Sequence, residues 1–129
     1  MYLSSGAPIA PNIATILERN NGEILIGTSG HSMFLLETKG DSINARQISQ
    51  FIPSNLITSA YKDKKGNLWI STGDNGIFRF DENNQSKHYS GEKDIAKNTV
   101  SSMCEDHQGN LYMSSLKKGL FIYDDKADT

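Results

Sequence analysis

The chain has 129 residues and a formal net charge of −2, from 13 basic and 15 acidic side chains. This length predicts one domain or part of one, and the lack of a basic patch argues against nucleic-acid binding. The longest apolar runs, such as residues 33–36, are too short to span a bilayer. Cys104 is the single cysteine, which excludes an internal disulfide and a metal site built from several thiolates.

Three segments of 27 residues align without a gap when Gly22, Gly66 and Gly109 are placed in one column. The segments span residues 11–37, 55–81 and 98–124. The second and third copies share 10 identities, whereas the first and second share 5. Recurrence at a fixed period of this size indicates a repeat architecture, in which each copy is one supersecondary unit.

Each copy begins with a short strand, predicted at residues 13–18, 57–62 and 100–105, in which small side chains let neighbouring backbones approach. A hairpin turn follows at residues 63–67 and again at 106–110. In this turn Asp63 and Asp106 are expected to accept backbone N–H groups, and Gly66 and Gly109 to supply a positive φ. The sequence therefore predicts a hairpin at the start of the second and third copies.

The second strand of the middle copy, residues 68–72, is apolar at three consecutive positions, so both of its faces must be covered. A turn at residues 73–76 leads to a third strand at residues 77–81. Weaker fourth strands are predicted in the spacers, at residues 43–49 and 86–90. The sequence thus predicts four short strands in each period.

Four short antiparallel strands in each period of about 43 residues are typical of a β-propeller blade. Helical solenoids of similar period are excluded, because glycine-containing turns interrupt every candidate helix. We therefore predict an all-β fold, a partial β-propeller of about three four-stranded antiparallel blades with the last blade incomplete. The expected parts are an end strand or linker of a preceding blade (residues 1–10), a divergent blade (11–49), a second blade (55–90) and a third blade without its fourth strand (98–124).

The stretches "KDKKGNLWISTGDNGIFRFD" and "EDHQGNLYMSSLKKGLFIYD" resemble two-component regulator propeller repeats. The usual phrase of that family runs Glu-Asp-x-x-Gly-Asn-Leu-Trp-Ile-Gly-Thr, then Gly-Leu, an aromatic residue and Asp. The first copy departs from it, since Arg19, Glu23, Leu25 and Ser32 replace the turn Asp, the Asn, the Trp and the later Gly.

The resemblance implies a fragment of the sensor propeller of a hybrid two-component signal-transduction protein. Such a protein has a periplasmic sensor, a membrane span, a histidine kinase and a response regulator, and many members of the family sense oligosaccharides. The expected partners are therefore the rest of the parent propeller and, as a ligand, an oligosaccharide. Two alternatives stay open, namely a stand-alone interaction scaffold that closes by self-association and part of a propeller enzyme such as a lyase.

Recurrence in the repeat favours structural roles for most of the distinctive side chains. A catalytic carboxylate pair meets once in one site, so acids that recur at two fixed blade positions are interpreted as turn caps. These acids are Asp63 and Asp106 at one position, and Asp81 and Asp124 at the other. Trp69, Tyr112 and Leu25 share a column and are expected between adjacent blades, although the two aromatic residues could also form a sugar-stacking platform. The predicted turn and packing residues are Asp63, Gly66, Trp69, Phe78, Asp106, Gly109, Tyr112 and Phe121.

No catalytic residue, metal site or cofactor is predicted. His31, His88 and His107 occupy three different blade positions, so a common metal site is not expected. "GDNG" at residues 73–76 offers too few oxygen ligands for a Ca²⁺ loop. Cys104 shares a column with Leu17 and is interpreted as a small core residue.

Function is expected where the copies differ, which is chiefly in the turns after the second strands. The residues predicted to face a ligand or partner are His31, Asp74, Asn75, Lys117 and Lys118. We also expect self-association, either as a homodimer or head to tail, by pairing of Tyr2–Ser4 of one chain with Leu120–Tyr123 of another. Nucleic-acid binding and membrane insertion by this segment are not expected.

Overall fold

The computed structural model describes residues 12–19, 22–39, 42–48, 52, 56–89, 100–115 and 119–123. The described residues form β-strands and turns, and no helix among them is long and apolar enough to cross a membrane. The strands are β1 (Ile13–Glu18), β2 (Ile24–Thr28), β3 (Met33–Lys39), β4 (Ser42–Gln47), β5 (Ile57–Lys62), β6 (Leu68–Thr72), β7 (Ile77–Phe80), β8 (Ser86–Tyr89), β9 (Val100–Glu105), β10 (Leu111–Ser115) and β11 (Gly119–Ile122).

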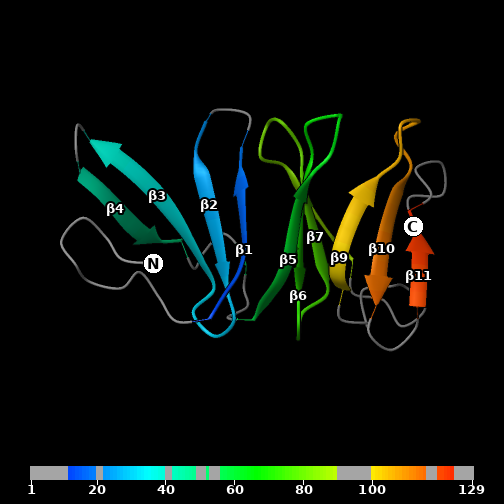
Figure 1. The fold of residues 1–129 in the computed structure, drawn as a ribbon, viewed down its shortest axis with the longest axis horizontal. Helices are drawn as coiled ribbons and strands as arrows, with labels where there is room; N and C mark the ends of the chain where they lie inside the picture. Colours follow the sequence, from blue (N-terminus) through cyan, green and yellow to red (C-terminus); the bar gives the residue numbers. More distant parts are fainter. Residues whose placement is uncertain are drawn as a thin grey trace.

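The strands form three antiparallel sheets, which we call blade 1 (β1–β4), blade 2 (β5–β8) and blade 3 (β9–β11). Strands that follow one another in the chain are neighbours in every sheet. Figure 1 shows the three blades side by side in chain order. We call the first strand of each blade, β1, β5 or β9, its inner strand. The expected all-β fold of about three antiparallel blades is confirmed.

The inner strands β1, β5 and β9 begin and end at the predicted residues. The fourth strands are displaced slightly, since β4 spans Ser42–Gln47 and β8 spans Ser86–Tyr89. Residues 86–88 of β8 are exposed and only Tyr89 is buried, so hydrophobicity marks this strand weakly in the sequence. In the described part of blade 3, β11 has β10 on one side and no strand on the other.

Strand β6 is buried along its whole length, because blades 1 and 3 cover its two faces. Side chains alternate across a strand, so Leu68 and Ile70 face blade 1 and Trp69 faces blade 3. Full burial of one such side chain contributes about 1.5–3 kcal/mol. The core between blades 1 and 2 consists of Leu25, Met33, Leu35, Ile52, Ile57, Leu68, Ile70, Phe78 and Phe80. The core between blades 2 and 3 consists of Trp69, Ile77, Tyr89, Val100, Met103, Leu111 and Met113.

Blades 1 and 2 lie close together at Gly27. A Cβ atom at this position would lie 2.5 Å from Cγ2 of Ile57 and 2.7 Å from Cγ2 of Thr15. The absent side chain therefore makes room for the first residue of the next inner strand. At the equivalent position in blade 2 stands Ser71, which is fully buried and makes polar contacts with blade 3 instead.

Candidate functional site

The turn between β5 and β6 is organised by one carboxylate. Oδ1 of Asp63 accepts the backbone N–H groups of Lys65 and Asn67 at 3.0 and 2.8 Å. Oδ2 accepts the side-chain amide of Asn67 at 3.2 Å and the indole N–H of Trp69 at 2.8 Å. Gly66 closes the turn with a φ of 88°. Asp63 therefore caps the turn and also orients the aromatic ring that lies between blades 2 and 3.

Blade 3 repeats this turn around Asp106. Its carboxylate accepts the N–H groups of Gln108 and Asn110, the side-chain amide of Asn110 and the hydroxyl of Tyr112. The Asn110 amide, assisted by its backbone N–H, Tyr112 and Gln108, lowers the pKa of Asp106 from its ordinary value of 3.8 to about 2. The same contact with Asp106 raises the pKa of Tyr112. Tyr112 thus donates its hydroxyl where Trp69 donates its indole N–H.

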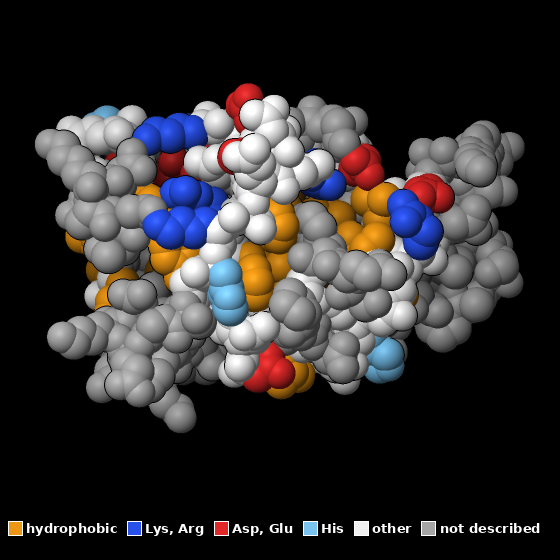
Figure 2. All heavy atoms as spheres, turned by 180° about the vertical axis from the view of Figure 1, so that it is seen from behind, with side chains coloured by type: hydrophobic (Ala, Val, Ile, Leu, Met, Phe, Trp, Pro, Cys, Tyr) orange, Lys and Arg blue, Asp and Glu red, His pale blue; other side chains and the backbone are white. Residues whose placement is uncertain are grey.

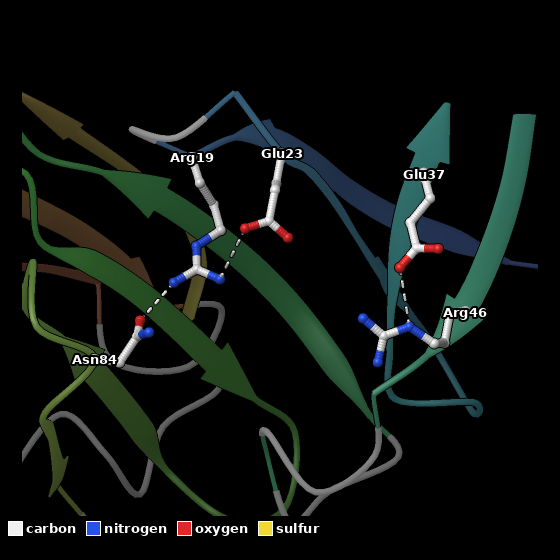
Figure 3. A network of polar contacts seen from close by, with 5 residues as sticks. All are labelled: Arg19, Glu23, Glu37, Arg46 and Asn84. Atoms are coloured by element: carbon white, nitrogen blue, oxygen red, sulfur yellow. Dashed lines mark hydrogen bonds and ion pairs between the residues drawn. The ribbon is translucent and has the colours of Figure 1, made fainter. Parts of the chain in front are cut away.

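The turn backbone does not depend on the aspartate. In blade 1 the N–H of Arg19 bonds to the carbonyl of Glu23, and Gly22 closes the turn with a φ of 85°. Arg19 lies between Glu23, at 4.0 Å, and Oδ1 of Asn84 in blade 2, at 2.5 Å (Figure 3). A second ion pair joins Arg46 of β4 to Glu37 of β3 over 3.1 Å. Arginine at the position of the turn aspartate therefore links two blades.

A fourth turn of this kind joins β7 to β8, and the interpretation of Asp81 as a turn cap is confirmed. Oδ1 of Asp81 accepts the N–H groups of Asn83 and Gln85, both at 2.9 Å. Asn84, with a φ of 61°, takes the place of the closing glycine. The signal was present in "DENNQ", because asparagine tolerates the left-handed conformation that this turn requires.

The turns after the second strands use a threonine. In blade 2, Oγ1 of Thr72 donates to the carbonyl of Gly76 and accepts the N–H of Asn75, both at 2.8 Å. In blade 1, Thr28 makes the same two contacts, with Ser32 and His31. Ser32 adopts a φ of 60° in place of the glycine. These two turns therefore have one backbone frame and different outward side chains.

Each of these turns is braced by its own fourth strand. Nε2 of His88 lies 2.6 Å from the carbonyl of Asn75, and the side-chain amide of Gln47 donates to the carbonyl of His31 over 2.8 Å. His88 and Gln47 hold equivalent places, since they pair across the sheet with Phe78 and Phe34. The His88 ring also stacks on Phe78 with centroids 4.1 Å apart. Only the register of the sheet reveals this equivalence, because the spacers do not align in sequence.

Three of the predicted ligand-facing residues lie in these two turns, which form one rim. His31 and Asp74 are exposed and Asn75 is half-buried. Figure 1 shows the β2–β3 and β6–β7 turns on the same lower rim. Lys117 and Lys118 lie outside the described residues. Phe121 is half-buried in β11, opposite Met113.

On the face drawn in Figure 2, the charged side chains of the described residues lie mainly along the opposite rim, and hydrophobic side chains lie across the middle. Between blades 2 and 3 a cleft of about 460 Å³ opens here, with Trp69 and Tyr123 among its lining residues. Arg79 lies over the Trp69 ring, 5.5 Å from its centroid, and donates to the hydroxyl of Tyr123 over 2.8 Å. The charged group is thus already held by the aromatic residues of the cleft.

Glu105 of blade 3 also joins blades 2 and 3 at this rim by hydrogen bonds. Its carboxylate accepts the backbone N–H of Lys64 at 2.8 Å and the hydroxyl of Tyr61 at 3.3 Å. Burial, followed by the charge of Glu105, raises the pKa of Tyr61. Nζ of Lys64 donates to the carbonyl of Asp106 over 2.8 Å.

No group of three or more His, Cys, Asp or Glu side chains in the described part of the chain could hold a metal ion. Cys104, interpreted from the sequence as a small core residue, is exposed. It lies on the face of blade 3 that points away from blade 2, and among the described residues no sheet covers that face.

Comparison with known proteins accounts for the repeated phrase. Residues 52–74 and 94–117 match the family model described as two component regulator propeller. These segments are two-component regulator propeller repeats. No curated protein sequence matches the chain.

Solved propellers share the arrangement of the repeats. The extracellular domain of BT4673 from B. thetaiotaomicron, assigned to hybrid two component systems, matches with 24% identity and a TM-score of 0.66. The alignment covers 91% of this chain and 17% of that one. For the extracellular domain of BT3049 from the same organism, likewise assigned, the identity is 21%, the TM-score is 0.61 and the coverages are 85% and 14%. The chain therefore spans less than one-fifth of these solved chains.

A third solved structure, virginiamycin B lyase from Staphylococcus aureus with quinupristin, matches with 12% identity and a TM-score of 0.54. The alignment covers 88% of this chain and 41% of that one. At such low identities the likeness concerns the fold, which is a set of consecutive propeller blades.

Proposed function

We propose that the chain is a non-catalytic part of the extracytoplasmic sensor propeller of a hybrid two-component protein. The match of two segments to two-component regulator propeller repeats carries this proposal. The extracellular domains with the same fold support it, and they also support a location outside the cytoplasm, which we take to be the periplasm. In this proposal the repeats build a scaffold, and the kinase belongs to another part of the protein.

The ligand or partner meets the rim that contains His31, Asp74 and Asn75, and Lys117 and Lys118 contribute from the equivalent turn of blade 3. The support is that the turns in blades 1 and 2 share one threonine-based frame while their outward side chains differ. A constant frame with variable side chains suits recognition. Polar and charged groups of this kind would hydrogen-bond the hydroxyls of an oligosaccharide, which is the ligand class that we propose.

A reporter assay in the native host tests this function. Asp74→Ala combined with Lys117→Ala and Lys118→Ala should abolish the transcriptional response to the inducing oligosaccharide and leave protein abundance unchanged. Glu82→Ala is the matched control, because Glu82 is an exposed acid in the turn between β7 and β8, away from the proposed rim. An undiminished response in the triple variant would contradict the assignment of the rim.

Self-association is a second candidate, and the unpaired side of β11 in the described part of blade 3 favours it. An edge strand offers free N–H and C=O groups to another chain. The expected partner segment, Tyr2–Ser4, lies outside the described residues, so its pairing with Leu120–Tyr123 stays a prediction. Sedimentation of the 129-residue chain at tens of micromolar would reveal a dimer, and a monomer at all concentrations would rule this pairing out.

A further inference from the structure

Two hydroxyl groups of blade 2, one in β5 and one in β6, bind the first residue of β9 in blade 3. Oγ1 of Thr58 donates to the carbonyl of Val100 over 2.8 Å. Oγ of Ser71 donates to the same carbonyl over 3.1 Å and lies 2.7 Å from Oγ1 of Thr58. Two side chains of one blade therefore converge on one backbone oxygen of the next.

A β-bulge places these groups. The register of β5 against β6 shifts between Ile57 and Ser59, so Thr58 is the extra residue. The inner strands of blades 1 and 3 shift at the equivalent places. Bulges re-aim a side chain, and here the Thr58 hydroxyl turns toward the neighbouring blade. The residue before the bulge is β-branched in all three blades, being Ile13, Ile57 or Val100.

Blade 3 carries the same pair of hydroxyl groups on its outer face. Ser101 and Ser114 are equivalent to Thr58 and Ser71, and their hydroxyl oxygens lie 3.0 Å apart. Their other contacts are long bonds within blade 3, from Ser101 to the carbonyl of Ser114 at 3.5 Å and from Ser114 to the carbonyl of Ser102 at 3.4 Å. In the described part of the molecule no carbonyl of another blade meets them.

This feature is not a general property of the repeat. Blade 1 has Ala14 and Gly27 at the two equivalent positions, and there the side chain of Ile57 fills the space left by the glycine. Between blades 2 and 3, where the two hydroxyl groups are present, they bind a carbonyl of the next blade. Their presence in blade 3 therefore indicates a neighbour that docks as blade 3 docks on blade 2.

The outer face of blade 3 also has apolar side chains that no sheet among the described residues covers. Leu120 is 66% exposed and Ile122 is 58% exposed, and both pair across the sheet with residues on the same face as Tyr112. Cys104 lies beside them and is exposed. In blades 1 and 2 the equivalents of Cys104, Leu17 and Tyr61, pack against the core shared with the following blade.

We propose that Ser101 and Ser114 bind the backbone carbonyl that precedes the bulge in the inner strand of the next blade of the native propeller. That strand begins with a β-branched residue and lays its apolar side chains on Tyr112, Leu120 and Ile122. The inference rests on the proposed function only in that the chain belongs to a larger propeller. The chain covers 17% and 14% of the two sensor propellers compared above, which leaves ample room for such a blade.

Cys104 reports on the docking, because it lies on the face to be covered. Two samples are treated with N-ethylmaleimide, namely the protein as its native cells make it and the isolated 129-residue chain at low concentration. Modification of Cys104 in each sample is followed by mass spectrometry. The native protein should react about tenfold or more slowly, since a covered thiol reacts only after local opening. The matched control is Gln108→Cys in a Cys104→Ser background, because Gln108 is exposed in the adjacent turn and should react fast in both samples.

Variants test the hydroxyl groups themselves. Ser114→Arg should restore fast modification of Cys104 in the native protein, and the milder Ser101→Ala/Ser114→Ala pair should raise the rate in part while circular dichroism stays unchanged. Equal reactivity of Cys104 in the native protein and in the isolated chain would overturn the proposal. Protection of Cys104 that the double alanine variant leaves intact would also overturn it. Protection of Cys104 in the isolated chain that grows with chain concentration would overturn it too, because it would identify a second copy as the occupant. If Cys104 is protected but the native protein does not signal, the proposed function is wrong and the docking of a next blade still stands.

Discussion

Trp69 donates its indole N–H to the carboxylate of Asp63 over 2.8 Å, while its ring packs between blades 2 and 3. The residue that caps the turn therefore also sets the orientation of the side chain that joins two blades. The ring contacts Tyr123 edge-on, with centroids 4.8 Å apart, and stacks on Tyr89, with centroids 5.9 Å apart. Turn formation and blade packing are coupled through this single hydrogen bond.

Removal of the carboxylate should therefore cost more than removal of an ordinary turn cap. We expect Asp63→Ala to lower the free energy of unfolding by about 2–3 kcal/mol, because four donors lose a charged acceptor. Urea denaturation followed by Trp69 fluorescence measures it. Asp81→Ala is the control, since Asp81 accepts two backbone N–H groups and no aromatic donor, and its loss should be smaller. Equal losses would show that the bond to Trp69 contributes nothing.

Stability should depend on pH through Asp106. Its pKa in the folded chain is about 2, below the ordinary value of 3.8, so the folded state binds this proton less readily than the unfolded state. The stabilisation is then fully present above about pH 4 and is lost as the pH falls toward 2. Unfolding free energies of the native chain and of Asp106→Asn should differ at pH 6 and converge between pH 4 and 2. A difference independent of pH would contradict the shift.

The two hydroxyl groups between blades 2 and 3 should show strong coupling. Either Thr58→Val or Ser71→Ala leaves one donor for the Val100 carbonyl, so each should cost about 1 kcal/mol or less. The double variant removes both donors, and we expect it to cost more than the sum of the single changes. A double-mutant cycle by urea denaturation measures the coupling. Strict additivity would mean that the two groups act independently.

Gly27 should tolerate no side chain. In Gly27→Ala the new Cβ would meet Ile57 and Thr15 at distances that force the blades apart, and we expect a loss of about 1–3 kcal/mol. Gly73→Ala is the matched control, because a Cβ there would lie 3.4 Å or more from its neighbours. Thermal unfolding of both variants decides the matter, and a Gly27→Ala chain as stable as the Gly73→Ala chain would show that the blades can separate without cost.

Much of the fold could be predicted because the repeat writes its strands and turns in local chemistry. An aspartate followed three residues later by glycine, as in Asp63 and Gly66, marks a turn. The consecutive apolar residues 68–70 show that both faces of their strand are covered. The capping role of Asp81 was predicted from its recurrence, but Asn84 as the closing residue was not, because the other turns of this kind have glycine there. The bracing of the β6–β7 turn by His88 could not be foreseen, because it depends on the register of a fourth strand that carries almost no hydrophobic signal.

The sequence by itself determined the class of structure, namely short antiparallel strands in repeated blades with Asp–Gly turns, because these depend on residues close together in the chain. The tertiary structure alone decided which faces meet. It placed Trp69 against blade 3, brought Thr58 and Ser71 to the carbonyl of Val100, and left Cys104 on a face that no sheet among the described residues covers. Such contacts join residues that are far apart in the chain, and they exist only once the bulges and the stacking of the sheets have set their geometry.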